Sequence, residues 1–294
     1  MGYNPVPVHP EHLCQYAAFL ARSLKATSIP QYLNIIGILH KEMGLPNPLL
    51  HNWPLQSLLT GIRRAAGETP SQKLPITPQL LLNIHSKLNL SNSIDASFWA
   101  ICLCAFFGMF RKSHLLPTSS RNFNPSKQLI KSDFIFFDRG MLLTIRWSKT
   151  IQFRERVVQI PLPRIPDSPL CPVKASTQAF RFTIRTPSSS QAFNWINHGN
   201  NNSITFTYSA FTTKLRRILS DLGLSPREYA GHSFRRGGAS FAYKAGVPIE
   251  LIKALGDWRS DAILLYLTIP LSIRLQSVDM LKKAILSSLP TQHT

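Results

Sequence analysis

The sequence predicts a mainly α-helical protein with one small antiparallel β-sheet, an α+β fold. Apolar residues recur at helical spacing through most of the 294 residues. By contrast, residues 133–162 hold three short runs rich in β-branched and aromatic residues, which are typical of strands. A proline-rich polar stretch at residues 70–78 separates the two parts of the chain. We therefore expect a small helical domain over residues 1–73 and a larger domain over residues 74–294.

Three helices are expected in the first domain. The first runs from about Pro10 to Ser23, and the second begins at the cap formed by residues 27–30 and stops before Gly44. The third covers residues 54–66. The second helix is expected to bury one face, made of Tyr32, Ile35, Ile36 and Leu39.

The larger domain is expected to place its sheet between two groups of helices. Strands are predicted at residues 133–138, 141–147 and 156–162, and a surface loop at residues 186–203. Helices are predicted at residues 78–88, 94–110, 208–222, 232–245, 248–255, 261–267 and 272–289.

The charge of the chain indicates a polyanionic partner. There are 33 Lys and Arg residues against 14 Asp and Glu, a formal net charge of +19. The bases are interleaved with core residues, so they do not form a disordered basic tail, and nucleic acid is the simplest partner. The longest nearly apolar run, residues 97–110, is too short to span a bilayer, so no membrane partner is expected. The four cysteines form no CxxC pair, which favours a reduced intracellular setting without a zinc site.

Several residues of the larger domain have spacings that suit phosphate chemistry. Arg111 follows the apolar run, and Lys149 lies at the predicted hairpin tip. His232 and Arg235 are three residues apart at a helix start, where unpaired amides already favour a phosphate. Gly237 and Gly238 would weaken that helix unless something approaches its backbone closely. Each feature alone also fits an ordinary structural role, such as a solvated lysine or a core tyrosine.

The order Arg, hairpin Lys, His-x-x-Arg, Trp and Tyr resembles the tyrosine recombinase (phage integrase) family. The matching positions are Arg111, Lys149, His232, Arg235, Trp258 and Tyr266. Residues 231–267 resemble the C-terminal motif of the family throughout, most of all in the eukaryotic mobile-element branch that includes DIRS-type recombinases. One position departs from the family pattern, because His114 stands where an acidic residue commonly orients the first arginine. This departure affects the expected rate and geometry more than the type of reaction.

The resemblance implies site-specific DNA cleavage and rejoining, as in recombination or integration, through a covalent 3′-phosphotyrosyl intermediate. Tyr266 would be the nucleophile, while Arg111 and Arg235 would hold the non-bridging oxygens. Lys149 would protonate the leaving 5′-oxygen, and His232 would support proton transfer. Trp258 would position its neighbours. The expected chemistry needs no metal ion and no other cofactor.

The resemblance also implies the partners. Double-stranded DNA would be held between the two domains, with Arg22, Lys25, Arg63 and Arg64 as contacts from the first domain. The functional unit would be a homotetramer on paired DNA sites, in which the last helix docks on a neighbouring subunit or packs on its own domain. In a eukaryotic host the expected location is the nucleus.

Two other functions use the same fold. A type IB topoisomerase-like enzyme would relax strands with the same residues, but the short chain and small first domain fit recombinases better. A domesticated, non-catalytic DNA-binding protein would keep the fold without the chemistry. The six filled catalytic positions argue against this second function, and His114 is the one hint in its favour.

Overall fold

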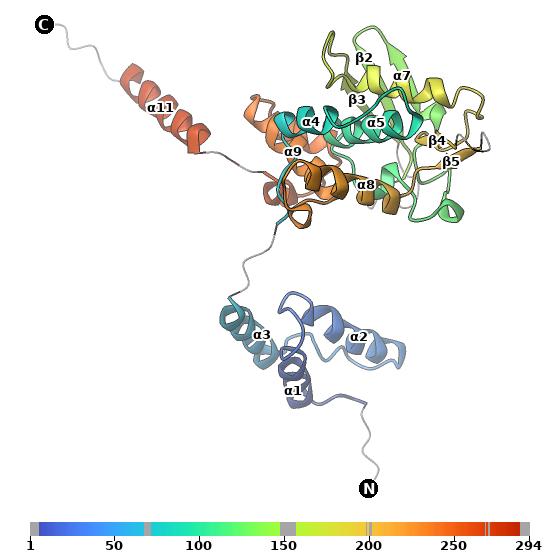
Figure 1. The fold of residues 1–294 in the computed structure, drawn as a ribbon. Coiled ribbons are helices and arrows are strands. Elements are labelled where there is room, and N and C mark those ends of the chain that lie inside the picture. Colours follow the sequence, from blue (N-terminus) through green and yellow to red (C-terminus); the bar gives the residue numbers. More distant parts are fainter. Residues whose placement is uncertain are drawn as a thin grey trace, which may run out of the picture. The chain divides into compact units, whose positions relative to one another are not determined.

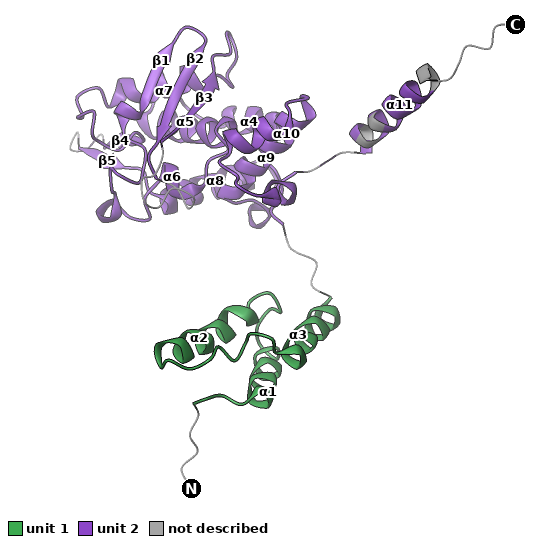
Figure 2. Ribbon diagram, turned by 180° about the vertical axis from the view of Figure 1, so that it is seen from behind, with its two compact units in different colours: residues 1–71 green, residues 72–294 purple. Residues whose placement is uncertain are grey.

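The computed structural model describes residues 6–67, 72–147, 157–197, 199, 202–267, 269 and 271–288, with the backbone alone at 272, 274, 277 and 286–288. The chain divides into two compact units, residues 1–71 and residues 72–294 (Figure 2). The units are helical apart from small antiparallel sheets in the second. The predicted α+β fold class is therefore confirmed.

The first unit is built from α1 (Pro10–Leu20), α2 (Ile29–Glu42) and α3 (Trp53–Ala66), shown in blue to teal in Figure 1. Asn52 caps α3, because its side chain accepts a hydrogen bond from the Leu55 amide at 3.1 Å. The α3 helix ends where Gly67 adopts a left-handed backbone with φ of 55°. The core of the unit consists of Leu13, Ala17, Leu20, Ile29, Leu33 and Leu55.

The expected buried face of α2 is wrong at three of its four positions, since only Ile36 packs against the core of the unit. Tyr32, Ile35 and Leu39 are exposed, whereas Leu33, Gly37 and His40 are buried. Apolar residues surround most of this helix, so spacing alone did not decide which side faces the core. Contacts from distant segments decide it: the Nε2 atom of His40 accepts a hydrogen bond from the Val8 amide at 3.0 Å.

The second unit is organised around α5 (Ser93–Phe107), which is buried along nearly its whole length. It packs against α7 (Pro172–Phe182), α9 (Gly231–Lys244) and β4 (Asn194–Ile196). A helix that is apolar on all sides must be covered on all sides, and this one forms the core of the unit. The short α4 (Pro78–His85) precedes it, and the single turn of α6 (Lys112–Leu115) follows it.

The predicted three-stranded sheet is present in the order β1-β2-β3 (Figure 1). Its strands are β1 (Phe134–Phe137), β2 (Gly140–Ile145) and β3 (Val158–Pro163), and both pairs are antiparallel. Two short 3₁₀ helices precede it, η1 (Ser120–Asn122) and η2 (Lys131–Asp133). Gly140 is required at the start of β2, since a Cβ there would lie 2.2 Å from the Leu162 carbonyl oxygen.

The segment predicted as a surface loop, residues 186–203, is partly ordered structure. It contains β4, which pairs with β5 (Ser203–Thr205), and its residues Ala192 and Phe193 are buried in the core. Strands of three residues carry too short a pattern to be distinguished from a loop. The helix α7 was likewise not predicted from the sequence.

Helices return after β5, as predicted. They are α8 (Tyr208–Asp221), η3 (Pro226–Glu228), α9, α10 (Ile249–Leu255), η4 (Asp261–Leu265) and α11 (Leu271–Ser288). Residues 261–265 form a 3₁₀ helix and not the α-helix expected there. The apolar side chains of Leu275, Val278, Leu281 and Ile285 on α11 are exposed. Within the described part of the chain, no helix is long and apolar enough to cross a membrane.

Part of the expected linker belongs to the second unit. Ile76 is fully buried, and its amide donates a hydrogen bond to the Ser233 carbonyl at 2.9 Å. The amide of Leu74 donates to the Glu228 carbonyl at 2.8 Å. These bonds attach residues 74–76 to the start of α9, so the expected linker does not extend to Pro78.

Candidate active site

The first turn of α9 presents His232 and Arg235. The Ser233 hydroxyl accepts a hydrogen bond from the Ala230 amide at 3.0 Å and so fixes the start of the helix. A Cβ at Gly237 would lie 1.8 Å from the Ile76 carbonyl oxygen, and one at Gly238 would lie 2.0 Å from that of Phe106. The close backbone approach expected at these glycines is therefore real, and it holds α9 tightly against α5.

Arg235 is a charged side chain held almost entirely inside the protein, with 1% of its surface exposed. One guanidinium nitrogen, Nη1, donates to the Met109 carbonyl oxygen. Its Nε and Nη2 atoms are buried without a hydrogen-bond partner. A buried guanidinium with unmet donors is costly unless an acceptor arrives, so these atoms favour an anionic ligand.

Two aromatic rings fix the place of this guanidinium. Its central carbon lies 3.6 Å from the centre of the Trp258 ring and 5.4 Å from the centre of the Tyr266 ring. The planar charge over the indole face is a cation–π contact, which holds Arg235 without using its donors. A Cβ at Gly256 would lie 1.7 Å from Trp258, so glycine is required for the indole to pack there.

Tyr266 follows directly after η4. The Ser260 hydroxyl accepts a hydrogen bond from the Ala262 amide at 3.4 Å, and the Tyr266 amide donates to the Ile263 carbonyl at 2.7 Å. The Tyr266 ring meets the Trp258 ring edge to face, with centroids 5.4 Å apart, and its centroid lies 6.3 Å from that of His232. The phenol thus shares one small region with Arg235, Trp258 and His232.

Arg111 reaches the same region from the other side of the core. It is the residue before α6, where the chain leaves α5. Its Nη1 atom lies 3.8 Å from Oδ2 of Asp257, and this nitrogen makes no hydrogen bond. Asp257 directly precedes Trp258, whose ring contacts Arg235, and the charge of Arg111 lowers the pKa of both His232 and Arg235. The structure therefore brings together Arg111, His232, Arg235, Trp258 and Tyr266.

The electrostatics keep both histidines of the site neutral. Partial burial lowers the pKa of His232, and the charges of Arg235 and Lys112 lower it further. Burial lowers the pKa of His114 to about 3, and Arg111 and Arg235 add to this effect. Burial and the charge of Arg111 likewise lower the pKa of Arg235, while Tyr266 and Asp257 favour its charged form. Within the described residues the site holds two guanidinium groups facing a single carboxylate, which makes it a receptor for an anion.

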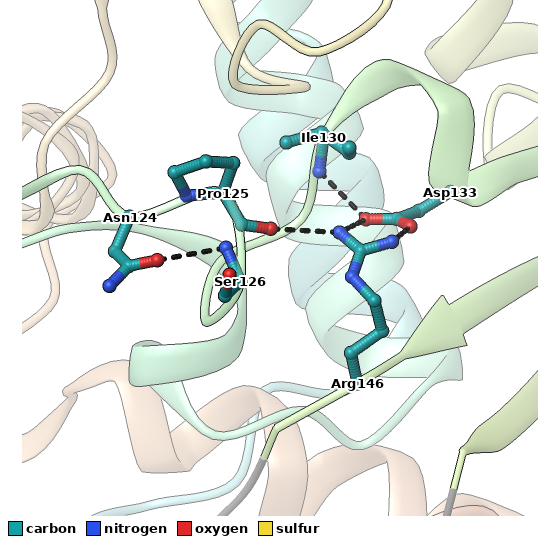
Figure 3. Close-up of polar contacts among 6 residues, drawn as sticks. All are labelled: Asn124, Pro125, Ser126, Ile130, Asp133 and Arg146. Carbon is teal, nitrogen blue, oxygen red and sulfur yellow. Dashed lines mark hydrogen bonds and ion pairs between the residues drawn. The ribbon is translucent and has the colours of Figure 1, made fainter. Parts of the chain in front are cut away.

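Lys149 lies outside the described residues, but the strand that leads to it is firmly held (Figure 3). Arg146 forms an ion pair with Asp133 and donates to the Pro125 carbonyl at 2.9 Å. The buried Asp133 carboxylate also accepts from the Ile130 amide at 2.8 Å. Burial nevertheless raises the pKa of Asp133, against the opposing effect of these partners. These contacts fix the end of β2 just before residue 148.

The remaining predicted residues are exposed on the first unit. Arg22 and Lys25 lie between α1 and α2, and Arg63 and Arg64 lie in the last turn of α3. Asp257 and Met109 were not predicted to have a role, but both contact an arginine of the site. Asp257 stands beside Trp258 in the motif, and this adjacency was the available signal. In the described part of the chain, no group of three or more His, Cys, Asp or Glu side chains could hold a metal ion.

Comparison with solved structures reveals the fold. The chain is similar to the Tn1549 transposon integrase in complex with circular intermediate DNA, at a TM-score of 0.54 and 13% identity over 92% of this chain and 85% of that one. It is also similar to the XerH site-specific recombinase bound to palindromic difH substrate. Here the TM-score is 0.62 and the identity 13%, over 90% of this chain and 70% of that one. The chain is similar as well to a lambda integrase dimer bound to a COC′ core site, with a TM-score of 0.56 and 14% identity over 90% of this chain and 82% of that one. No family model and no curated protein matches the chain. These neighbours are tyrosine recombinases and integrases, and the chain has their α+β fold.

Proposed function

We propose that this protein is a tyrosine recombinase that cleaves and rejoins DNA at specific sites through a 3′-phosphotyrosyl intermediate. One observation supports this function above the others. The buried Arg235 has two unpartnered donors, and it lies beside Arg111 and within reach of the Tyr266 ring. A nucleophile next to two fixed guanidinium groups is the arrangement that phosphodiester attack requires.

The reaction can be followed atom by atom. The scissile phosphate would enter at the start of α9, where helix amides favour an anion, and its non-bridging oxygens would accept from Arg235 and Arg111. The Tyr266 oxygen would attack phosphorus, forming a P–O bond to the tyrosine as the P–O5′ bond breaks. The lowered pKa of His232 leaves its imidazole neutral near pH 7, so it can accept the phenolic proton. The reverse attack by a 5′-hydroxyl would rejoin the strand.

Lys149 is proposed as the acid that protonates the departing 5′-oxygen. It follows the end of β2, which Arg146 and Asp133 hold in place (Figure 3). Lys149 is three positions after Arg146 in the sequence, a reach of up to about 10 Å in an extended chain. Trp258 is proposed to position Arg235 through its ring face.

Double-stranded DNA is the proposed partner. The similar Tn1549 integrase structure is a complex with circular intermediate DNA, and the XerH and lambda integrase structures are bound to a difH substrate and to a core site. The net charge of +19 and the exposed Arg22, Lys25, Arg63 and Arg64 of the first unit fit the same ligand. We extend the proposal to a core-binding role for residues 1–73, a catalytic role for residues 74–294, and a homotetramer on paired sites. We also propose a mobile-element origin in the DIRS-like branch, with a nuclear location in a eukaryotic host.

A nicked suicide DNA substrate tests the function. The unmutated chain should form a covalent DNA adduct that resists denaturation, in the presence of EDTA and without a nucleotide. Tyr266→Phe should abolish the adduct and leave DNA binding nearly unchanged, because affinity comes from many phosphate contacts. The matched control is Tyr243→Phe, which removes a hydroxyl from α9 and should leave the adduct intact.

The other outcomes assign the protein to the rival functions. Binding without an adduct would indicate a DNA-binding protein that has kept the fold and lost the chemistry. An adduct that forms with Tyr266→Phe would disprove the choice of nucleophile. Relaxation of supercoiled DNA without exchange of strands between two sites would favour the topoisomerase-like activity.

A further inference from the structure

Asp257 is the carboxylate that the fold directs at the arginines of the site. Its side chain is 7% exposed, and its Oδ2 lies 3.8 Å from Nη1 of Arg111. Its negative charge also favours the charged forms of Arg235 and His114. A buried carboxylate among cations contributes strongly to their arrangement, because the local dielectric is low.

The backbone at Asp257 is built for this placement. Its φ is +52°, a left-handed conformation that is uncommon outside glycine but tolerated by aspartate. This conformation ends α10, where the Asp257 amide donates to the Ala254 carbonyl at 3.2 Å and the Trp258 amide to the Lys253 carbonyl at 2.9 Å. One turn therefore directs a carboxylate to Arg111 and the next ring to Arg235.

A second left-handed residue serves the other arginine. Met109 has a φ of +48°, and its carbonyl oxygen accepts from Nη1 of Arg235. Each guanidinium thus has an oxygen of a left-handed residue nearby, as a hydrogen-bond acceptor for Arg235 and as an ion-pair partner at 3.8 Å for Arg111. Such conformations persist where surrounding structure enforces them, and they are frequent at functional sites.

His114 cannot provide the missing negative charge. It is 3% exposed, and neither ring nitrogen has a hydrogen-bond partner. A neutral imidazole does not balance the positive charges of the Arg111 and Arg235 guanidinium groups. In the resemblance described above, this position commonly carries the acid that orients the first arginine.

We propose that Asp257 is a positioning residue that orients the Arg111 guanidinium toward the scissile phosphate, and that it replaces the carboxylate absent at position 114. The inference rests on the proposed function.

Asp257→Asn is the variant to test, because asparagine has the same shape, tolerates a positive φ and carries no charge. Adduct formation on the suicide substrate should slow by about 10²-fold, the cost of a misplaced catalytic group. The Kd for DNA should change by less than about 3-fold, since one orienting contact is lost among many phosphate contacts. The matched control is Asp261→Asn, an exposed carboxylate 3.2 Å from Lys253, which should react at the parental rate.

Recovery of adduct formation by a second substitution distinguishes a positioning role of Asp257 from a packing role. His114→Glu or His114→Asp, combined with Asp257→Asn, returns one carboxylate to the Arg111 neighbourhood. At least one double variant should recover adduct formation to within about 5-fold of the parent, which is small beside the loss expected from the single variant. A purely structural role would not be restored by a charge placed at a different backbone position. Since the double variants keep the charge balance, they decide the question alone if the single variant does not fold.

The results distinguish this inference from the proposed function. If the parent chain forms no adduct, the proposed function fails. If the parent forms an adduct and Asp257→Asn forms it equally fast, the positioning role is overturned. A slow single variant that neither double variant rescues also overturns it, because Asp257 would then act through packing.

Discussion

The buried His114 should make the second unit sensitive to acid. Its pKa is lowered to about 3 by burial and by the charges of Arg111 and Arg235, from the ordinary value of 6.5. In the unfolded chain the same imidazole titrates normally. Between these two values the unfolded state binds a proton that the folded state excludes, so the free energy of unfolding falls as the pH falls. The effect begins near the unfolded pKa of 6.5 and is complete near the folded pKa of about 3.

The size of the effect follows from the separation of the two pKa values. Each pH unit between them changes the free energy of unfolding by about 1.4 kcal/mol. From about pH 7 to about pH 4.5, His114 alone should lower the stability of the unit by about 2–3 kcal/mol. This is a substantial part of the roughly 5–15 kcal/mol by which proteins are stable.

The variant His114→Phe removes the titration and keeps a ring in the same buried position, near the Phe110 ring at 6.1 Å and among the charges of Arg111, Arg235 and Asp257. Urea unfolding of the full chain, measured for parent and variant at several pH values, isolates the effect, because other groups titrate equally in both proteins. The parent should lose about 2–3 kcal/mol more than the variant over the stated range. Parallel pH profiles of the two proteins would refute the reasoning and would mean that His114 is solvated or partnered in solution.

Two further predictions concern the general acid and the packing of α9. Lys149→Ala should slow adduct formation on normal DNA by roughly 10²–10⁴-fold, and a substrate with sulfur as the leaving 5′ atom should restore the rate, because a thiolate leaves without a proton. Arg235→Ala should show no such rescue. If Lys149→Ala slows adduct formation equally on both substrates, the lysine only holds DNA and is not the general acid. Gly238→Ala should destabilise the second unit by at least about 1–3 kcal/mol in thermal melts, because its Cβ would lie 2.0 Å from a backbone oxygen. The control is Gly61→Ala in α3, where nothing lies within 4 Å of the new Cβ, and it should stabilise the protein by up to about 1 kcal/mol. A Gly238→Ala variant of unchanged stability would contradict the close packing of α9 on α5.

Local patterns in the sequence were sufficient for most elements. The helix at residues 93–107 has apolar residues on every side, and the strands around Gly140 are rich in β-branched and aromatic residues. These signals depend on near neighbours in the chain, so they can be read without the fold. The face of α2 could not be read, because the bond from the Val8 amide to His40 joins residues 32 positions apart.

The site shows the same division. The spacing of His232 and Arg235 on one helix face is local and was predicted, as was the close approach to the glycines that follow. The pairing of Arg111 with Asp257 joins residues far apart in the chain, and no periodicity encodes it. The burial of Arg235 was likewise unpredictable, because an arginine in a motif is ordinarily expected at the surface.

The arrangement of charge explains why a neutral residue at position 114 is compatible with the proposed chemistry. Two carboxylates beside Arg111 and Arg235 would compete with a phosphate for the guanidinium donors, whereas a single carboxylate leaves Nε and Nη2 of Arg235 without partners. The neutral His114 adds no competing charge and occupies the space with a ring. The Oδ2 atom of Asp257 lies 3.8 Å from Nη1 of Arg111, beyond hydrogen-bond distance, so it attracts the guanidinium while this donor makes no hydrogen bond. A site arranged in this way retains its donors for an incoming phosphate while a single negative charge keeps Arg111 in place.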